Sequence, residues 1–334
     1  MKMPVYAKSK PAETIEEHNQ KLLESYERLK QFLDPEKVKK YDEVIKKILY
    51  YHDLGKLNHK FQNKLRIQKN RFIPELKDFR EIPHEWLSLA FISKEDKKLF
   101  RNFNTDGIRF ADLVQYCIAF HHTRTNSFDK KALEMTIQFD LEKNKGSLGI
   151  DYPLNYDYDI QKDIKHKIDS EANFKNYFEL LVFLKGILHK CDYSASAGIE
   201  PEKSYQGDYE ADFNKWLSQQ EWKLKPFQHK AKGLSDKNIV LIAATGSGKT
   251  EYSMNWINGQ KAFYLLGLKT AVNAMYRRFK DIFGNNTSLL HGEISYIFEQ
   301  DDTDERYTER IERARKLCAP LTIATADQLV TAVF

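Results

Sequence analysis

Histidine and aspartate residues stand at the ends of apolar helical segments throughout the first 200 residues of the chain. An adjacent His52–Asp53 pair follows one such segment, and an adjacent His121–His122 pair follows another. Single residues occupy comparable positions at His18, His84 and Asp192. Imidazole and carboxylate groups bind Mn, Fe, Co, Ni and Zn, and carboxylates also bind Mg. Two such cations close together can hold a phosphodiester and activate a water molecule.

Each of these residues, taken alone, has a simpler explanation. A single histidine on an apolar helix face is more often a hydrogen-bonded core residue than a metal ligand. Asp53 alone is compatible with a helix C-terminal turn, and His84 with a position beside an N-terminal cap. Five histidines and two aspartates at the ends of separate helices are harder to explain by packing. We therefore interpret the set as a metal site.

The order of these residues, H…HD…H…HH…D, resembles the HD phosphohydrolase superfamily, and the run HDLGK at 52–56 also fits. The double histidine and the final aspartate in DYSAS make residues 14–198 similar to the nuclease domain of the type I CRISPR-associated helicase–nucleases. This resemblance implies an all-α HD domain with two divalent cations (Mn, Fe, Co, Ni or Mg). One cation would be held by His18, His52, Asp53 and Asp192, and the other by Asp53, His84, His121 and His122.

The same resemblance implies catalytic roles for two residues. Asp53 would bridge the two cations, and Lys56 would lie near the substrate phosphate. The alternative for Lys56 is a solvated surface lysine.

Helical periodicity predicts the elements that carry these residues. Thr14 and Glu17 form a T-x-x-E capping box, and a helix follows with apolar positions from Ile15 onward. Further helices are expected to run into His52, to start near Pro83, to end at the double histidine, and to extend over about 174–192. Residues 143–165 are polar and are expected to form a surface loop.

A second group of residues is typical of phosphate binding. In the run ATGSGKT at 244–250, two glycines allow the backbone N–H groups to turn toward phosphate oxygens. Lys249 can reach the β- and γ-phosphates, and Thr250 can bind Mg. The run follows an apolar segment at 239–243 that we expect to be a strand, and it opens a helix. It resembles the phosphate loop of superfamily-two helicases, in which a glutamine such as Gln228 reads adenine. The ATP-binding residues are thus expected to be Gln228, Thr245, Gly246, Ser247, Gly248, Lys249 and Thr250.

Strands alternating with helices predict a parallel α/β sheet after about residue 195. The expected strands are short apolar runs at 239–243, 262–266, 287–290 and 321–325. By resemblance, this part is the start of a RecA-like helicase lobe. Residues 267–279 and 322–330 resemble helicase segments that grip single-stranded nucleic acid. They supply the candidate DNA contacts Lys269, Arg277, Arg278, Thr325 and Gln328.

A DExx box at the end of a strand, which a working helicase needs, is missing from the sequence. The acidic run at 301–305 has no apolar strand before it and is expected to be a helix N-terminus. The chain is therefore interpreted as the N-terminal part of a longer helicase–nuclease. ATP and Mg would bind the full-length protein, and helicase or ATPase activity is not expected of this fragment.

Length and composition fit this organisation. The 334 residues suffice for two domains, which we expect as an HD nuclease domain at 1–198, a connector at 199–225 and an incomplete RecA-like lobe at 226–334. The net charge of +5 is too small to indicate nucleic-acid binding by bulk charge. There is no membrane-span-length apolar run and no secretory signal. Three dispersed cysteines exclude a disulfide scaffold and fit the cytoplasm.

Together these features predict a metal-dependent nuclease that hydrolyses phosphodiesters of single-stranded DNA in CRISPR interference. An RNA-guided surveillance complex would recruit it, and part of an ATP-dependent DNA helicase would be attached. Two alternatives remain open. One is an HD phosphohydrolase acting on nucleotides, which would use the same metal ligands. The other is a non-catalytic module that binds ATP or DNA, for which those ligands would be dispensable.

Overall fold

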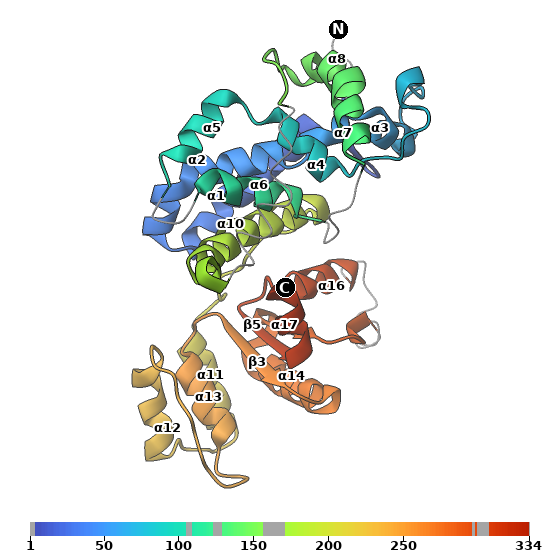
Figure 1. The fold of residues 1–334 in the computed structure, drawn as a ribbon. Coiled ribbons are helices and arrows are strands. Elements are labelled where there is room, and N and C mark those ends of the chain that lie inside the picture. Colours follow the sequence, from blue (N-terminus) through green and yellow to red (C-terminus); the bar gives the residue numbers. More distant parts are fainter. Residues whose placement is uncertain are drawn as a thin grey trace. The chain divides into compact units, whose positions relative to one another are not determined.

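The computed structural model of the chain describes residues 4–104, 109–122, 129–155, 171–295, 298 and 307–333. The acidic run at 301–305 and the second half of the expected loop at 143–165 lie outside the described residues. The chain divides into two compact units, Met1–Gly198 and Ile199–Phe334, each of which has its own hydrophobic core (Figure 1). We describe the two units separately.

The first unit is predominantly helical, as the periodicity predicted. Its helices are α1 (Ile15–Leu29), α2 (Pro35–Tyr51), α3 (His59–Leu65), α4 (His84–Ser88), α5 (Lys94–Arg101), α6 (Phe110–Ala119), α7 (Lys130–Thr136), α8 (Glu142–Asn144) and α10 (Glu171–Ala197). A short 3-10 turn, η2 (Leu54–Leu57), joins α2 to α3. The long helix α10 packs against α1, α2 and α6, so the apolar faces of these helices close one continuous core.

The predicted capping box begins α1. The Thr14 hydroxyl accepts a hydrogen bond from the Glu17 N–H at 3.1 Å, and the Glu17 carboxylate accepts one from the Thr14 N–H at 2.8 Å. These two bonds satisfy backbone donors that the first turn of a helix leaves without partners. Leu22 and Tyr26 are fully buried about two and three turns after the start of α1, which confirms the predicted apolar face.

A short antiparallel hairpin precedes α1 and departs from the all-α expectation. Strand β1 (Tyr6–Ser9) pairs with β2 (Ala12–Thr14), with Tyr6 opposite Thr14. Strands of four and three residues are too short to show an alternating pattern, so periodicity could not find them. The Gln62 side chain hydrogen-bonds the N–H and the carbonyl of Tyr6, at 3.1 and 2.8 Å, and so ties the hairpin to α3.

The second unit contains a three-stranded parallel sheet. Its strands β3 (Ala262–Leu266), β4 (Thr287–Leu290) and β5 (Leu321–Thr325) confirm three of the four predicted runs. The strand order is β3-β5-β4, so β5 lies between the two strands that precede it in the chain. The principal helices of this unit are α11 (Tyr209–Gln219), α12 (Pro226–Lys230), α13 (Lys249–Ile257), α14 (Lys269–Phe283), α16 (Tyr307–Arg315) and α17 (Ala326–Val333).

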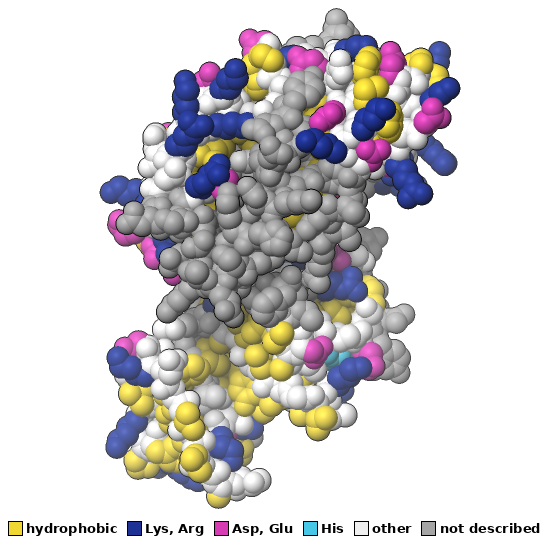
Figure 2. Space-filling view, in the orientation of Figure 1, with side chains coloured by type: hydrophobic (Ala, Val, Ile, Leu, Met, Phe, Trp, Pro, Cys, Tyr) yellow, Lys and Arg dark blue, Asp and Glu magenta, His cyan; other side chains and the backbone are white. Residues whose placement is uncertain are grey.

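The prediction of a strand at 239–243 is wrong. This segment is described but has no strand structure, and Val240 and Ile242 are 89% and 93% exposed. An apolar run becomes a strand only where a neighbouring strand accepts its backbone hydrogen bonds, and composition alone does not supply that neighbour. Phe263 and Leu265 on β3 are also exposed. Figure 2 shows hydrophobic side chains gathered on the second unit.

Two further sequence expectations concern cysteines and membranes. Cys117, Cys191 and Cys318 are all buried and form no disulfide. Within the described part of the chain, every helix falls short of the length and apolarity that crossing a bilayer would require.

Gly55 lies where the turn η2 approaches α4. A Cβ atom at this position would lie 2.0 Å from the His84 carbonyl oxygen and 2.7 Å from the Ser88 nitrogen, both of which are backbone atoms. We expect Gly55→Ala to lower the free energy of unfolding by about 1–3 kcal/mol, since the backbone must move to admit the methyl group. Equilibrium denaturation measures this loss.

Gly146→Ala is the matched control, because a Cβ atom at Gly146 would meet no atom within 4 Å. Its free energy of unfolding should stay within about 0.5 kcal/mol of the parent chain. Equal stability of the two variants would contradict the close approach of η2 to α4.

Candidate metal centre and phosphate-loop pocket

The seven predicted metal ligands converge in the first unit. They form two groups, and within each group the candidate ligand atoms all lie within 4.8 Å of one another. Asp53 belongs to both groups. The first group is Asp53, His84, His121 and His122, and the second is His18, His52, Asp53 and Asp192.

Six elements deliver these side chains. His52 is the C-terminal cap of α2, and Asp53 follows it at the start of η2. His84 is the first residue of α4, the double histidine follows α6, and the remaining two residues lie on α1 and α10. The Ser88 hydroxyl donates to the His52 carbonyl at 2.7 Å and accepts from the Gly55 N–H at 2.9 Å. This hydroxyl therefore fixes α4 against the segment that carries the HD pair.

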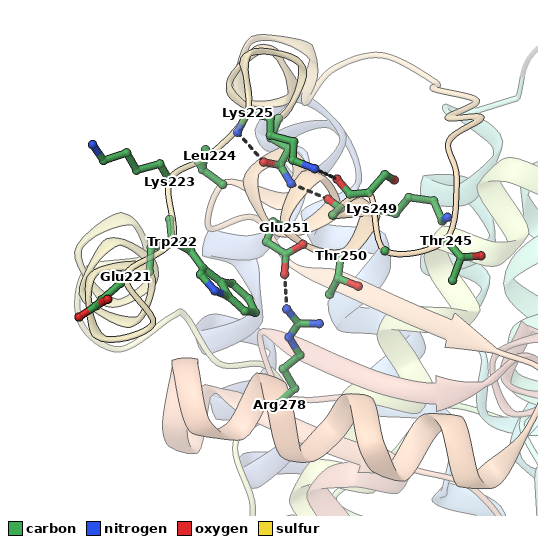
Figure 3. Close-up of a pocket in the computed structure, with 15 residues that line it drawn as sticks. Glu221, Trp222, Lys223, Leu224, Lys225, Thr245, Lys249, Thr250, Glu251 and Arg278 are labelled. Carbon is green, nitrogen blue, oxygen red and sulfur yellow. Dashed lines mark hydrogen bonds and ion pairs between the residues drawn. The ribbon is translucent and has the colours of Figure 1, made fainter.

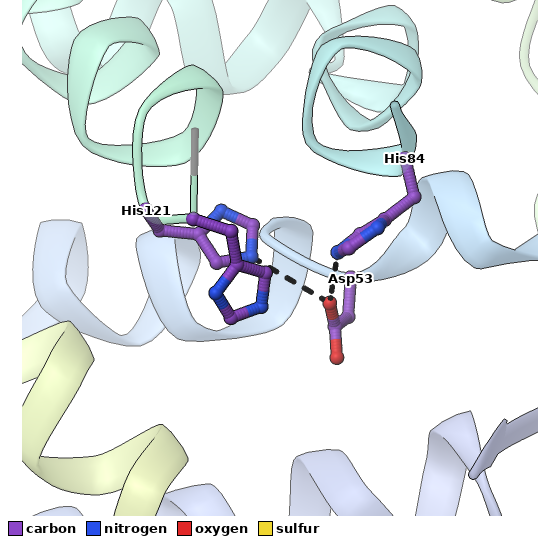
Figure 4. Close-up of side chains that lie close together, drawn as sticks. Asp53, His84 and His121 are labelled. Carbon is purple, nitrogen blue, oxygen red and sulfur yellow. Dashed lines mark ion pairs between the residues drawn. The ribbon is translucent and has the colours of Figure 1, made fainter. Parts of the chain in front are cut away.

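The Asp53 carboxylate lies between imidazoles on both of its oxygens. Oδ1 is 3.1 Å from Nε2 of His84 and 3.7 Å from Nε2 of His121 (Figure 4). Oδ2 is 3.4 Å from Nε2 of His52 and 3.6 Å from Nε2 of His18. One carboxylate thus faces four imidazole nitrogens, an arrangement compatible with sharing between two cations.

Buried polar atoms in this cluster lack hydrogen-bond partners. Nε2 of His52, His84 and His121 and Oδ1 of Asp53 are buried, and no described residue forms a hydrogen bond with them. Nδ1 of His52 and His121 lies 2.8 and 2.6 Å from the carbonyl oxygens of Leu49 and Ile118, so Nδ1 carries the hydrogen and donates it.

The two Nε2 atoms then present lone pairs to the cluster. Buried lone pairs that face a carboxylate are costly unless a cation or a proton lies between them. The donor set and its unpartnered atoms therefore fit a divalent metal centre.

The electrostatics of the cluster favour the metal-binding forms of His121, Asp53 and Asp192. His52 differs, because burial would lower its pKa but Asp53 and Asp192 raise it above its usual value. Burial lowers the pKa of His121 to about 4 although Asp53 acts in the opposite direction, so this imidazole is neutral at pH 7. Burial would raise the pKa of Asp53, but the charges of His52 and Lys56 lower it well below its usual range. The pKa of Asp192 is also lowered, since the influence of the neighbouring His18 and His52 outweighs its burial. Neutral imidazoles and ionised carboxylates are the states that divalent cations require.

Lys56 belongs to the same cluster. Its Nζ lies 2.6 Å from Oδ2 of Asp53, and its side chain is only 13% exposed. The alternative of a solvated surface lysine is therefore wrong.

Sequence reasoning missed Glu13 as a neighbour of the cluster. Glu13 is buried on β2, and its Oε1 lies 2.8 Å from Nδ1 of His18. Burial would raise the pKa of Glu13, but hydrogen bonds from Lys21, Lys8 and His18 lower it below its ordinary value. Glu13 precedes the capping box of Thr14 and Glu17 and belongs to no motif, so the sequence carries no signal for its role.

The phosphate-loop residues line a pocket of about 670 Å³ in the second unit (Figure 3). Gln228 accepts a hydrogen bond from the Lys225 N–H and donates one to the Gly248 carbonyl, each at 2.7 Å. Lys249 Nζ donates to the carbonyl oxygens of Ala243 and Ala244, both at 2.9 Å. The pocket is lined by all seven predicted ATP-binding residues: Gln228, Thr245, Gly246, Ser247, Gly248, Lys249 and Thr250.

Two of the five candidate DNA contacts, Arg278 and Thr325, are not exposed. Arg278 forms an ion pair with Glu251 in the phosphate-loop pocket and lies over the Trp216 ring, 5.4 Å from its centroid (Figure 3). Thr325 is 5% exposed at the end of β5, because the central strand of the sheet is covered.

The other three candidates are more accessible. Lys269 is exposed and pairs with Glu293 at 2.5 Å. Arg277 is exposed on α14, and Gln328 is partly exposed on α17, where it donates to Asp327. Amphipathicity placed α14 correctly, but it could not tell which of two adjacent arginines faces the pocket.

A helical unit that gathers an HD pair with further histidines and an aspartate defines an HD-type domain. Residues 12–197 match the family described as "Cas3, HD domain", and the chain belongs to this family.

Relatives and solved structures extend this similarity. The chain is 27% identical to the CRISPR-associated nuclease/helicase Cas3 of Methanothermobacter thermautotrophicus over 84% of its length and 40% of the relative. It is 24% identical to a second Cas3 nuclease/helicase, from Methanocaldococcus jannaschii, over 84% of its length and 45% of the relative. Its fold is similar to the crystal structure of T. fusca Cas3 with ATP, with a TM-score of 0.54 and 17% identity over 98% of this chain and 43% of that one. The chain spans less than half the length of these relatives.

The fit of the cluster to divalent cations predicts a stability effect. Mn²⁺ should raise the midpoint of thermal unfolding of the first unit, because an ion bound only by the folded state stabilises that state. At a Mn²⁺ concentration of one hundred times the dissociation constant, the free energy of unfolding rises by about 2.7 kcal/mol. Asp53→Ala should abolish the shift, since it removes a ligand from both groups. Scanning fluorimetry with Mn²⁺ and with EDTA measures the effect.

Asp78→Ala is the control, because Asp78 is exposed and lies outside both groups. It should retain the full Mn²⁺ shift. A shift of the same size in Asp53→Ala would contradict the metal centre.

Proposed function

We propose that the first unit is a metal-dependent nuclease domain that hydrolyses phosphodiesters of single-stranded DNA in CRISPR interference. The observation that carries this proposal is a buried Asp53 carboxylate that faces imidazole Nε2 atoms without hydrogen-bond partners. The family of the chain, and relatives named as nuclease/helicases, support it.

Two groups of side chains would hold the cations. His18, His52, Asp53 and Asp192 would hold one, and Asp53, His84, His121 and His122 would hold the other. The mixture of imidazole and carboxylate suits Mn, Fe, Co, Ni or Mg. When bound, two divalent cations supply an activated water and neutralise the charge that develops on the phosphate oxygens.

The residues of the chain prepare the site for these cations. Carbonyl oxygens at the ends of α2 and α6 fix the Nδ1–H tautomer of His52 and His121, so their Nε2 atoms need no rearrangement. Burial keeps His121 neutral, and its neighbours keep Asp53 ionised. We infer that the cluster is organised before metal and DNA bind, which reduces the entropy lost on binding.

Lys56 would act on the substrate. Its ammonium group lies 2.6 Å from Asp53 Oδ2, where it partly compensates a buried negative charge. With Asp53 engaged as a ligand, Lys56 Nζ would be available to contact a phosphate oxygen of the DNA. Its 13% exposure is consistent with a side chain at the border of the cluster.

We propose a second function, nucleotide binding, for the pocket of the second unit. Gly246 and Gly248 have positive φ angles of 76° and 95°, which turn the loop backbone ahead of α13. The amides at the start of α13 and the Lys249 ammonium favour an anionic phosphate chain. Gln228, already bonded to the loop through Gly248, would read adenine.

The full-length protein would combine these two units with further segments, since the relatives are more than twice as long. By analogy with proteins named Cas3 nuclease/helicase, we propose that it unwinds DNA with ATP and Mg in the cytoplasm. An RNA-guided surveillance complex would deliver its single-stranded DNA substrate. The more accessible candidate DNA contacts in the second unit are Lys269 and Arg277, which are exposed, and Gln328, which is partly exposed.

The nuclease proposal is tested with circular single-stranded DNA and Mn²⁺. We expect the parent chain to cut the circle and Asp53→Ala to lose detectable cleavage, because both cation sites lose a ligand. Asp78→Ala should cleave at the parent rate, and circular dichroism should stay helical in both variants. Release of phosphate from mononucleotides without cleavage of the circle would favour the nucleotide phosphohydrolase instead. Unimpaired cleavage by Asp53→Ala would contradict the two-metal proposal.

The nucleotide proposal predicts binding without turnover. The chain should bind a fluorescent ATP analogue, and Lys249→Ala should weaken binding at least about tenfold by removing the phosphate-facing cation. Lys237→Ala, at an exposed position outside the pocket, is the control. ATP hydrolysis should be undetectable, because the carboxylates among the described pocket residues are Glu221 and Glu251, and Glu251 is paired with Arg278. DNA-stimulated phosphate release would contradict this expectation.

A further inference from the structure

Glu13 stands next to the proposed metal centre without belonging to it. It lies on β2, one residue before the cap of α1, and its side chain is 3% exposed. Its Oε1 is 2.8 Å from Nδ1 of His18. An ionised carboxylate only accepts hydrogen bonds, so Nδ1 of His18 carries the hydrogen.

That hydrogen bond determines where the other nitrogen of His18 points. Nε2 lies 3.1 Å from Oδ1 of Asp192 and 3.6 Å from Oδ2 of Asp53. With Nδ1 engaged by Glu13, Nε2 is the atom of His18 that can bind a cation between these two carboxylates. Rotation of the ring away from them would break the buried bond to Glu13.

Glu13 is itself held by two lysines. Lys8 on β1 lies 3.0 Å from Oε2, and Lys21 on α1 donates to the same oxygen. Lys8 Nζ also donates to the Ser196 carbonyl at 3.3 Å, near the end of α10, the helix that carries Asp192. The hairpin, α1 and α10 are thereby joined around one buried carboxylate, and three donors surround it.

His18 differs in this respect from two other imidazoles of the cluster. His52 and His121 donate from Nδ1 to neutral backbone carbonyls. His18 donates to a charged carboxylate, which is the stronger acceptor and transfers more electron density to the ring. Carboxylate–histidine–metal arrangements of this kind fix the ring and increase its basicity as a ligand.

We propose that Glu13 is a positioning residue that fixes the tautomer and orientation of His18 and strengthens Nε2 as a ligand for a divalent cation. This inference rests on the proposed metal-dependent nuclease. Lys8 and Lys21 keep Glu13 in place. The hairpin that precedes α1 is then part of the metal centre's support, although none of its residues would touch a cation.

The test is Mn²⁺ binding, followed by the electron paramagnetic resonance signal of free Mn²⁺. Glu13→Ala should weaken one of two binding phases about 10–100-fold, the usual effect of losing such a partner. Glu13→Gln keeps an acceptor oxygen but loses the charge, and it should lie between the parent and Glu13→Ala. It also remains informative if Glu13→Ala does not fold.

Glu17→Ala is the matched control for a general loosening of α1. It breaks the capping box, which should cost about 0.5–2 kcal/mol of stability. The lost carboxylate hydrogen-bonds Thr14, whereas His18 Nδ1 is bonded to Glu13. Its Mn²⁺ affinity should match the parent within about twofold, although its unfolding midpoint falls.

A double-mutant cycle separates positioning from a merely structural role. In a His18→Ala background, Glu13→Ala should change Mn²⁺ affinity by less than about twofold, because Glu13 acts through His18. Parent-like affinity in Glu13→Ala, or an equal loss in both backgrounds, would overturn this inference alone. A parent chain that binds no Mn²⁺ would overturn the metal centre and this inference with it.

Discussion

The buried carboxylate of Asp53 is the interaction on which the first unit depends. Asp53 is 1% exposed, and an ionised carboxylate at such a position costs several kcal/mol unless nearby charges and hydrogen bonds compensate it. Compensation comes from Lys56 and from imidazoles that separate helices deliver to both carboxylate oxygens. Each of these helices must therefore hold a fixed position relative to η2. The tight packing of Gly55 against α4 and the double hydrogen bond of Ser88 are local consequences of that requirement.

The same requirement explains why much of the first unit could be predicted from sequence. Helices that must bring side chains to one point carry a histidine or aspartate on or beside an apolar periodic segment, and such segments are visible in the chain. The expected helix end at Asp192 is wrong, because α10 continues to Ala197. The seven residues that meet in the structure are the seven that order and resemblance selected. The hairpin and Glu13 could not be found in this way. Their contribution depends on a contact between β2 and α1 that has neither periodicity nor a motif.

The second unit shows the opposite limit of sequence reasoning. The runs at 262–266, 287–290 and 321–325 became strands because each has a parallel neighbour. The equally apolar run at 239–243 has no neighbour in the described sheet and stays exposed. A strand forms only where two segments pair, so composition alone cannot tell which of several apolar runs becomes a strand.

The phosphate loop nevertheless keeps an ordered shape without a strand before it. Gln228 links α12 to the Gly248 carbonyl, and the pair of Arg278 with Glu251 links α14 to α13. These side-chain interactions thus hold the phosphate loop in place where no strand precedes it. A Cβ atom at Gly248 would lie 2.2 Å from Gln228 Nε2, so the loop and the glutamine are packed too closely for a larger residue.

The first unit therefore holds its candidate site through groups that would bind no cation themselves. Glu13 engages Nδ1 of His18, and backbone carbonyls engage Nδ1 of His52 and of His121. Such partners determine which atom faces the site, although each lies only three to five residues from its histidine in the chain. A sequence motif records the groups that touch a ligand, because chemistry restricts their type. The groups behind them can be any donor or acceptor that geometry brings within reach, and for that reason only the folded structure reveals them.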